Sequence, residues 1–389
     1  MDALQRGIVI LLRSAVTGEK LELPAEFQLE DACRILSKHQ VLPLAYQGAV
    51  NCGADQQEPV MQQLLNAYYR NMIRSEKQMR AAERIYRAFE ENRIDYMPLK
   101  GCNMKRLYPK PELRVMGDAD ILIRLDQAGR IRQVMEELGF CLKSENDHVF
   151  NWLSDDLYVE LHKSVVPPED GDYYAYYGTG WRLGVKGAGH RYDMSPEDAF
   201  VFLFTHFARH YRIAGIGCRH VTDLYVYCRT YLQMDEAYIR AELEKLHLLA
   251  FYENMLRVLE VWFTGGKTDD ITELITAFVF SGGSWGTTEA MMYSQEVKSA
   301  RKHGGIRHAN LRSVIRAIFP PLGSIKLRYT VLCRASWLLP VMWVVRWFDI
   351  LFFSPQNIRR KVKILRSIDD DVILSHQQAL NYVGLDYYF

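Results

Sequence analysis

The first part of the chain shows the hydrophobic spacing of helices. Between Val60 and Arg93, apolar side chains recur every three or four positions, and charged side chains fill the positions between them. This period is typical of an amphipathic helix that packs one side against a core. We therefore expect residues 1–92 to form an N-terminal helical region.

After Asn92 the pattern changes to short apolar runs separated by helical segments. Strands are predicted at 94–99, 119–125, 140–143, 148–153 and 157–162. Helical segments are predicted at 104–108 and 126–138, between these runs. Short strands with interposed helices over about 100 residues are typical of a small mixed-sheet domain. We assign residues 93–192 to this domain.

The chain from Pro167 to His190 is rich in Gly, Tyr and Asp and predicts a long loop or hairpin. Ser195 then occupies the position of a helix N-cap, because Pro196 and two acidic residues follow it. The pattern stays helical to residue 300, apart from two glycine-containing breaks. These features predict a helical domain at 193–389 and an α+β fold for the whole chain.

The most apolar segment is ASWLLPVMWVVRWFDILFF, residues 335–353. Arg346 and Asp349 interrupt it, whereas a membrane span wants ~20 apolar residues. We therefore expect a buried or interfacial helix and no transmembrane segment. Aromatic and basic residues across 335–366 also fit peripheral contact with a membrane or RNA. We favour a buried helix followed by one with a solvated cationic face.

Composition narrows the class of protein. The chain has 389 residues with 49% hydrophobic and 24% charged residues, which excludes a disordered protein. The formal net charge is +1, so no global attraction to nucleic acid or an anionic membrane is expected. The seven cysteines include no C-x-x-C pair, which argues against a disulfide framework or a zinc ribbon. Since a secretory apolar region is also missing, we expect a cytoplasmic protein.

Candidate chemistry begins with Asp118 and Asp120, at the start of a predicted strand. Residues two apart in a strand point to the same face, so these two carboxylates converge. Their repulsion is offset by a cation, and a hard divalent ion such as Mg²⁺ fits oxygen ligands.

A third carboxylate comes from Glu160, which shares one face of the predicted strand 157–162 with His162. Together with Asp118 and Asp120, Glu160 could hold two metal ions ~3.5–4 Å apart, the arrangement used for in-line phosphoryl transfer. For His162 three interpretations stay open: it orients Glu160, contacts a nucleotide or packs in the core.

Cations precede the acidic pair. Lys100-Gly101 ends a predicted strand, where glycine lets a phosphate approach the backbone. Lys100 and Arg114 are placed to bind triphosphate oxygens, and arginine suits a bidentate grip. His206 and His210 lie four apart on one helix face, and we expect them to pack against the sheet, with Asp223, rather than bind zinc.

The order of these residues resembles an uncharacterised bacterial nucleotidyltransferase family in the DNA polymerase β-like superfamily. Its pattern occurs here as Leu99-Lys100-Gly101, Tyr108-Pro109, Arg114-Val115-Met116-Gly117-Asp118-Ala119-Asp120 and Glu160-Leu161-His162. The resemblance covers residues 40–350, although Lys100-Gly101 stands where the wider superfamily has Gly-Ser. It implies a small mixed-sheet catalytic domain between N-terminal helices and a larger C-terminal helical region.

The resemblance also implies a site and a reaction. Two Mg²⁺ ions, or Mn²⁺, would be bound by Asp118, Asp120 and Glu160. The NTP, ATP among the candidates, would lie near Lys100, Gly101, Arg114, Gly117 and His162.

The implied reaction transfers a nucleoside monophosphate to an acceptor and releases pyrophosphate. The acceptor is left open between a small molecule, a peptide or protein, and RNA. The alternative is a module on the same fold that binds a nucleotide or partner without turnover, and the complete acidic set argues against it.

Overall fold

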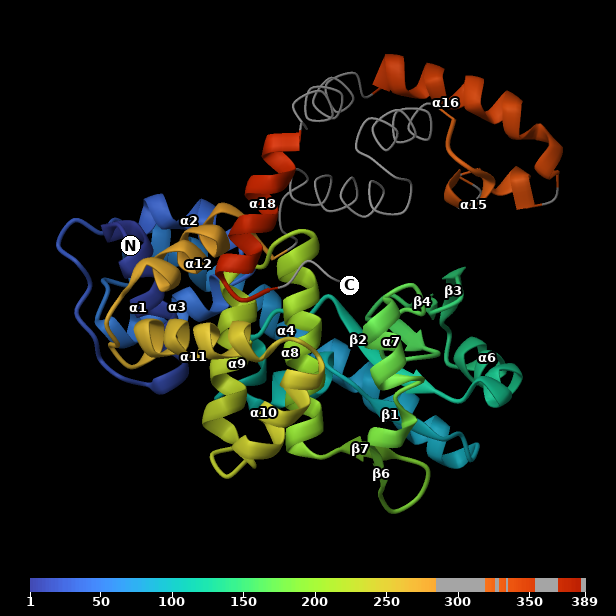
Figure 1. The fold of residues 1–389 in the computed structure, drawn as a ribbon, viewed down its shortest axis with the longest axis horizontal. Helices are drawn as coiled ribbons and strands as arrows, with labels where there is room; N and C mark the ends of the chain where they lie inside the picture. The colour runs from blue at the N-terminus through green and yellow to red at the C-terminus, as the bar shows by residue number, and fades with distance from the viewer. Residues whose placement is uncertain (285–318, 326–328, 334, 354–369, 386–389) are drawn as a thin grey trace. The chain divides into compact units, whose positions relative to one another are not determined.

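The computed structural model describes residues 1–284, 319–325, 329–333, 335–353 and 370–385 (Figure 1). Contacts between residues divide the chain into two compact units. The first comprises Met1–Tyr211, Gly215–Gly286 and Asn381–Phe389, and the second Arg212–Ala214 and Thr287–Leu380. The fold is α+β, as the sequence predicts, and the five-stranded sheet belongs to the first unit.

The first unit begins with the helices that the hydrophobic spacing predicts. They are α1 (Ala3–Thr17), α2 (Leu29–Lys38), α3 (Leu42–Cys52) and α4 (Pro59–Glu91). Asp2 starts α1 with a capping box, because its carboxylate accepts from the Gln5 amide while the Gln5 side chain accepts from Asp2 N–H. Helix α4 buries one side and exposes charged residues on the other, so its predicted amphipathic character is confirmed.

The central sheet has five strands in the order β1-β2-β5-β4-β3. The strands are β1 (Tyr96–Pro98), β2 (Asp118–Ile123), β3 (Cys141–Glu145), β4 (Val149–Leu153) and β5 (Tyr158–His162). The intervening helices are α5 (Gly101–Leu107) and α6 (Ala128–Glu137). Strands β2 and β5 are parallel and the other pairs antiparallel, so the sheet is mixed, as predicted.

Alternation along β2 and β5 gives the sheet two unlike faces. Ile121 and Leu161 lie in the hydrophobic core with Ile85 and Phe89 of α4 and with residues of α6. Burying one such side chain stabilises the fold by about 1.5–3 kcal/mol. Because successive residues point to opposite faces, the polar residues between them point away from α4 and α6. The core thus fixes the orientation of the polar face.

The stretch from Pro167 to His190 differs from the predicted loop or hairpin. It contains helix α7 (Gly171–Tyr177), and only its end forms a hairpin, in which β6 (Gly184–Lys186) pairs with β7 (Tyr192–Met194). The helix forms because Tyr173 and Tyr177 bury their rings, and the Tyr177 hydroxyl lies 2.8 Å from Thr205 Oγ1. The aromatic residues that suggested a loop therefore anchor a helix.

Five helices follow in the first unit. They are α8 (Pro196–Ile213), α9 (Cys218–Thr230), α10 (Glu236–Lys245), α11 (Leu249–Phe263) and α12 (Asp270–Ser281). Ser195 caps α8 as predicted, because its Oγ accepts a 3.0 Å hydrogen bond from Asp198 N–H. Of the two predicted glycine breaks, Gly265-Gly266 lies between α11 and α12, and the other begins where α12 ends.

The described part of the second unit includes α15 (Leu322–Ile325), α16 (Leu339–Phe353) and most of α18 (Asp370–Tyr382), whose residues from Asn381 on belong to the first unit. The helix predicted in 335–353, as buried or interfacial, is present. Phe348 in α16 is 58% exposed, and Trp337, in the short helical turn before α16, is 77% exposed. Among the described residues, no helix is both long and apolar enough to cross a membrane. The basic residues predicted to follow, at 359–366, lie outside the described residues.

Candidate metal and nucleotide site

The polar face of the sheet gathers acidic residues from its two parallel central strands. In the register of β2 and β5, Asp120 pairs with Glu160, and Asp118 pairs with Tyr158. Asp118, Asp120, Glu160 and His162 all lie on the face opposite the α4–α6 core. The short local sequences thus bring together residues that are 40 positions apart in the chain.

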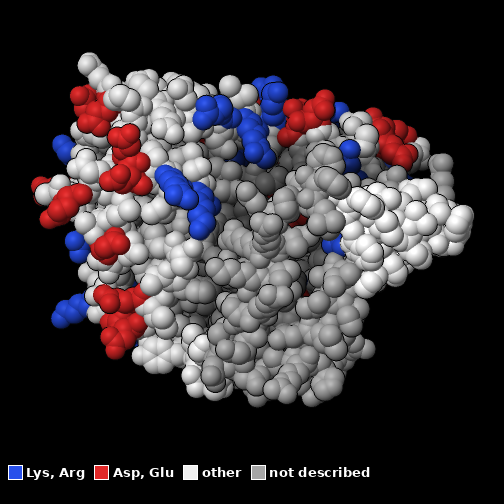
Figure 2. Space-filling model, turned by 90° about the horizontal axis from the view of Figure 1, so that it is seen from above, with Lys and Arg blue, Asp and Glu red and all other residues white. Residues whose placement is uncertain are grey.

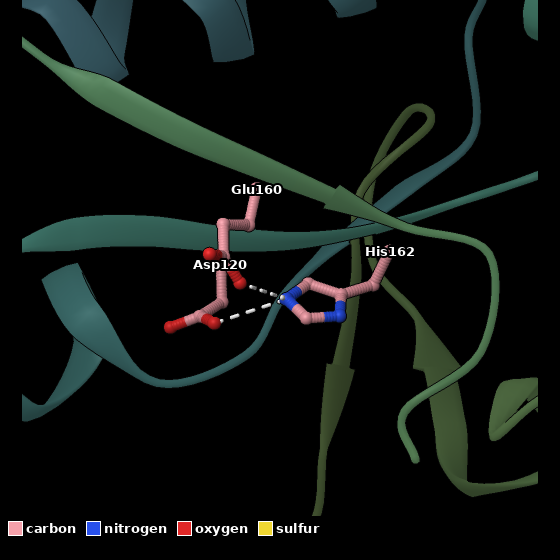
Figure 3. Close-up of side chains that lie close together, drawn as sticks. All are labelled: Asp120, Glu160 and His162. Atoms are coloured by element: carbon pink, nitrogen blue, oxygen red, sulfur yellow. Dashed lines mark hydrogen bonds and ion pairs between the residues drawn. The ribbon is translucent and has the colours of Figure 1, made fainter. Parts of the chain in front are cut away.

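Asp120, Glu160 and His162 point toward one another (Figure 3). His162 Nε2 lies 3.0 Å from Asp120 Oδ1 and 3.4 Å from Glu160 Oε2. One ligand atom from each residue lies within 4.8 Å of the others, which is a spacing that a single metal ion can bridge. Asp120 and His162 are buried, and the Glu160 side chain is 28% exposed. The cluster therefore has one open side.

Asp118 lies on the same face but outside this compact set. Burial, followed by repulsion from Asp120, raises the pKa of Asp118 to about 6. The sequence predicted three carboxylate ligands, whereas the ligand atoms gathered most closely are two carboxylates and an imidazole. A cation near Asp118 would favour its ionised form.

Cationic groups surround Asp120. Lys100 Nζ lies 3.3 Å from Asp120 Oδ1. Burial opposes ionisation of Asp120, but Lys100 and His162 hold its pKa below the usual range. Burial disfavours the charged form of His162, yet hydrogen bonds to Asp120 and Glu160 raise its pKa. Asp120 is therefore ionised at neutral pH.

Lys100 reaches this position because it lies in the short turn between β1 and α5, directly before the helix. Leu99 N–H donates a 3.0 Å hydrogen bond to the Asp120 carbonyl, which fixes the turn against β2. Gly101 has φ +20°, and a Cβ there would come within 2.8 Å of the Asp118 carbonyl oxygen. Gly101 is therefore required for close packing on β2, while the open space around Gly117 sets no such limit. Phosphate binding at Gly101 or Gly117 stays a prediction.

Arg114 lies in a different environment from the one the sequence suggested. Its Nε and Nη2 donate to the two Asp223 oxygens at 2.7 and 2.9 Å, and Tyr108 Oη donates to Asp223 Oδ1 at 2.7 Å. Arg114 and Asp223 are 6% and 4% exposed. Burial disfavours the charge on Arg114, but Asp223 raises its pKa above the usual range. The pair ties the loop before β2 to helix α9, and leaves Arg114 little freedom to grip a triphosphate.

Helices α8 and α9 contribute histidines near Lys100. His206 Nε2 lies 3.3 Å from Lys100 Nζ, and the His206 and His210 rings are 4.3 Å apart. His220, on α9, has its ring 6.3 Å from that of His210. Burial, then the charge on Lys100, lowers the pKa of His210 to about 3. The expected packing of His206 and His210 near the sheet is thus found, but Asp223 pairs with Arg114 instead.

His148 is a site residue that sequence reasoning missed. Its Nε2 lies 3.2 Å from His162 Nδ1, on the side of that ring opposite Asp120. His148 immediately precedes β4, and its neighbour Val149 pairs with His162. Only the register of β4 against β5 could have indicated this contact.

Comparison with known proteins identifies the class. The profile of a family described as "Uncharacterised nucleotidyltransferase" matches residues 25–264, which include every site residue described above. The chain belongs to this nucleotidyltransferase family, as its motif order predicts.

One solved structure shows a weaker similarity. It is the solution structure of the antibiotic-resistance factor ANT(2'')-Ia, with 14% sequence identity and a TM-score of 0.33. The match covers 48% of the present chain and 97% of that protein. No curated protein matches the sequence.

Proposed function

We propose that the protein is a metal-dependent nucleotidyltransferase that moves a nucleoside monophosphate from an NTP to an acceptor and releases pyrophosphate. The observation that carries this proposal is the register of β2 and β5, which brings Asp120, Glu160 and His162 together beside Lys100. Family membership supports the same reaction class.

The donor atoms at this face suit a divalent cation. Two carboxylates and one imidazole nitrogen lie within 4.8 Å of one another, and carboxylates favour Mg²⁺ or Mn²⁺. A bound ion there would neutralise developing charge and polarise phosphoryl oxygens. Asp118, on the same face, is placed to complete a second metal position as the motif resemblance implies.

The chain's own groups have separate roles in this proposal. Lys100 binds a triphosphate oxygen. Its ammonium lies 3.3 Å from Asp120, next to the proposed metal position, and its side chain is 15% exposed. His206 and His210 are deprotonated at neutral pH and serve as hydrogen-bonding groups rather than cations. Glu160, the more exposed carboxylate, would either bind the metal or, in its place, take a proton from an acceptor hydroxyl.

The face drawn in Figure 2 and the formal net charge of +1 give little indication of a nucleic-acid acceptor. On the face in Figure 2, acidic and basic side chains are interspersed over the described residues, and neither sign covers it. Binding to RNA or DNA rests on phosphate contacts from clustered Lys and Arg. A small molecule, a peptide or a protein is therefore preferred as the acceptor.

The test uses NTPs that carry a radiolabel on either the α- or the γ-phosphate. Each of ATP, GTP, CTP and UTP is supplied with Mg²⁺ or Mn²⁺ and with separated small-molecule, protein and RNA fractions of a cell extract. We expect the α label to enter one fraction and the γ label to leave as pyrophosphate. Transfer of the γ label to the acceptor would instead identify a phosphotransferase.

A matched control separates the site from general charge effects. Asp155 is an exposed carboxylate in the turn between β4 and β5, so Asp155→Asn should transfer the α label like the parent protein. Metal-dependent NTP binding with no label transferred to any fraction would favour the non-catalytic binding module.

A further inference from the structure

A chain of hydrogen bonds runs from the metal-binding cluster into the protein and determines which nitrogen of His162 faces the cluster. Ser164 Oγ donates to the Val166 carbonyl at 2.8 Å. Its hydroxyl hydrogen is thereby used, so Ser164 Oγ accepts from His148 Nδ1 at 3.1 Å. His148 therefore carries its hydrogen on Nδ1.

The hydrogen bond between His148 and His162 is the next one in the chain. Because the imidazole of His148 carries its hydrogen on Nδ1, where it donates to Ser164, its Nε2 presents a lone pair to His162. His162 Nδ1, 3.2 Å away, must donate to that lone pair. His162 is thus held with its hydrogen-bearing Nδ1 facing inward and its Nε2 facing outward.

His162 Nε2 faces two groups that only accept hydrogen bonds when ionised. Asp120 Oδ1 and Glu160 Oε2 lie 3.0 and 3.4 Å from it. Without an ion, a proton on Nε2 meets these acceptors. A metal ion shared with the two carboxylates would take the place of that proton, with the Nε2 lone pair as its third ligand. Metal-bound histidines usually donate their other N–H to a neighbour, which fixes the ring, and here His148 takes that place.

We propose that His162 Nε2 is a metal ligand alongside Asp120 and Glu160, that His148 is its positioning residue, and that the site therefore prefers Mn²⁺ to Mg²⁺. Mg²⁺ is bound chiefly through oxygen and keeps several waters, whereas affinity for nitrogen-containing sites rises along the first-row transition metals. This inference rests on the proposed metal-dependent function, and it adds a nitrogen ligand to an otherwise acidic site.

The first test needs no variant. Mn²⁺ is added to the full chain without nucleotide, and pulsed electron paramagnetic resonance records coupling between bound Mn²⁺ and a ¹⁴N nucleus. We expect an imidazole nitrogen coupling. Bound Mn²⁺ without that coupling would overturn the proposal, as would failure of Mn²⁺ to bind.

Variants then test the ligand and its positioning residue separately, by titration calorimetry with Mn²⁺ and with Mg²⁺. His162→Gln should lose the nitrogen coupling and reduce the preference for Mn²⁺ by about 10-fold or more. His148→Leu removes the acceptor for His162 and should weaken Mn²⁺ binding by ~10–100-fold. His148→Gln restores an acceptor and should recover most of that affinity, which a purely structural role would not explain.

A distant histidine provides the matched control. His190 bonds Asp95 at 2.9 Å near the β6–β7 hairpin, so His190→Gln should leave both metal affinities unchanged. Equal Mn²⁺ preference in His162→Gln and the parent would contradict the proposal. Because these measurements use metal alone, absence of the nitrogen coupling in the parent protein, together with intact NTP transfer, would reject this inference but keep the proposed function. The reverse result would reject the function and keep the ligand assignment.

Discussion

Asp120 and Asp223 are both buried carboxylates, 7% and 4% exposed, but their surroundings differ. Asp223 accepts two hydrogen bonds from Arg114 and one from Tyr108, so its charge is matched inside the protein. Asp120 contacts Lys100 and His162, yet it also lies near two further carboxylates, Asp118 and Glu160.

The difference distinguishes the structural ion pair Arg114–Asp223 from the acidic face around Asp120, which needs a bound cation. A bidentate arginine satisfies Asp223 without any outside group, so removal of either partner leaves a buried charge uncompensated. At the acidic face, burial and then repulsion from Asp120 raise the pKa of Asp118. Such repulsion does not help the protein to fold. We therefore expect changes at Asp120 to affect chemistry, and changes at Asp223 to affect stability.

The largest expected effect is at Asp120. Asp120→Asn keeps the side-chain shape but removes charge from the proposed metal position, so transfer of the α label should fall at least about 1,000-fold, or ~4 kcal/mol. The urea unfolding midpoint should fall only modestly, because the lost attraction to Lys100 and His162 is partly offset by relief of the repulsion from Asp118. Activity like that of the parent protein would refute the assignment of Asp120 to the reacting site.

At Asp223 we expect the reverse, a large loss of stability rather than a direct loss of label transfer. Asp223→Asn leaves the Arg114 guanidinium buried without its counter-ion, and should lower the free energy of unfolding by about 3–5 kcal/mol. Urea titration measures this loss. The double variant Arg114→Met/Asp223→Leu should lose less, because both charges of the pair are gone. If Asp223→Asn instead kept full stability but lost label transfer, Asp223 would belong with the reacting groups.

The two regions also differ in how far the sequence predicts them. Asp118 and Asp120 alternate within one short apolar strand and Glu160 within another, so the local pattern predicts the polar face of each strand. That the two strands pair was implied by the motif resemblance. The pairing of Arg114 with Asp223 joins residues 109 positions apart, on a loop and a helix, and no local pattern specifies it. His148 was missed for the same reason, because its contact with His162 depends on strand register.

Gly101 connects the two regions and offers a smaller test. Its carbonyl accepts from Arg114 Nη1 at 3.4 Å, while an added Cβ would meet the Asp118 carbonyl at 2.8 Å. Gly101→Ala should therefore cost about 1–3 kcal/mol of stability, measured by thermal or urea unfolding, since backbone rather than a flexible side chain must shift. Gly129 in α6 has open space around its Cβ position, so Gly129→Ala should be neutral or stabilising. Equal effects at the two glycines would show that β2 can shift to accept the methyl group.

The smallest expected effect is a pH dependence of stability that arises near the Arg114–Asp223 pair. Lys105 is buried, and its Nζ donates a 2.5 Å hydrogen bond to the Arg114 carbonyl. Burial, followed by repulsion from Arg114, lowers the pKa of Lys105 from 10.5 to about 7. Above that value the unfolded chain holds a proton that the folded protein lacks, so this contribution to stability rises with pH toward 10.5.

Lys105→Met removes the titrating group, so comparison with the parent protein shows whether Lys105 makes stability rise or fall with pH. Urea unfolding of both proteins from pH 7 to 10 should show the parent gaining stability relative to Lys105→Met, by at most about 1.4 kcal/mol per pH unit. A difference that stays constant with pH would mean that Lys105 remains charged in the folded state. The region around Asp223 would then hold the positive charge of Lys105 in addition to those of Arg114 and Arg219, so it would carry an excess of positive charge where the face with Asp118, Asp120 and Glu160 carries an excess of negative charge.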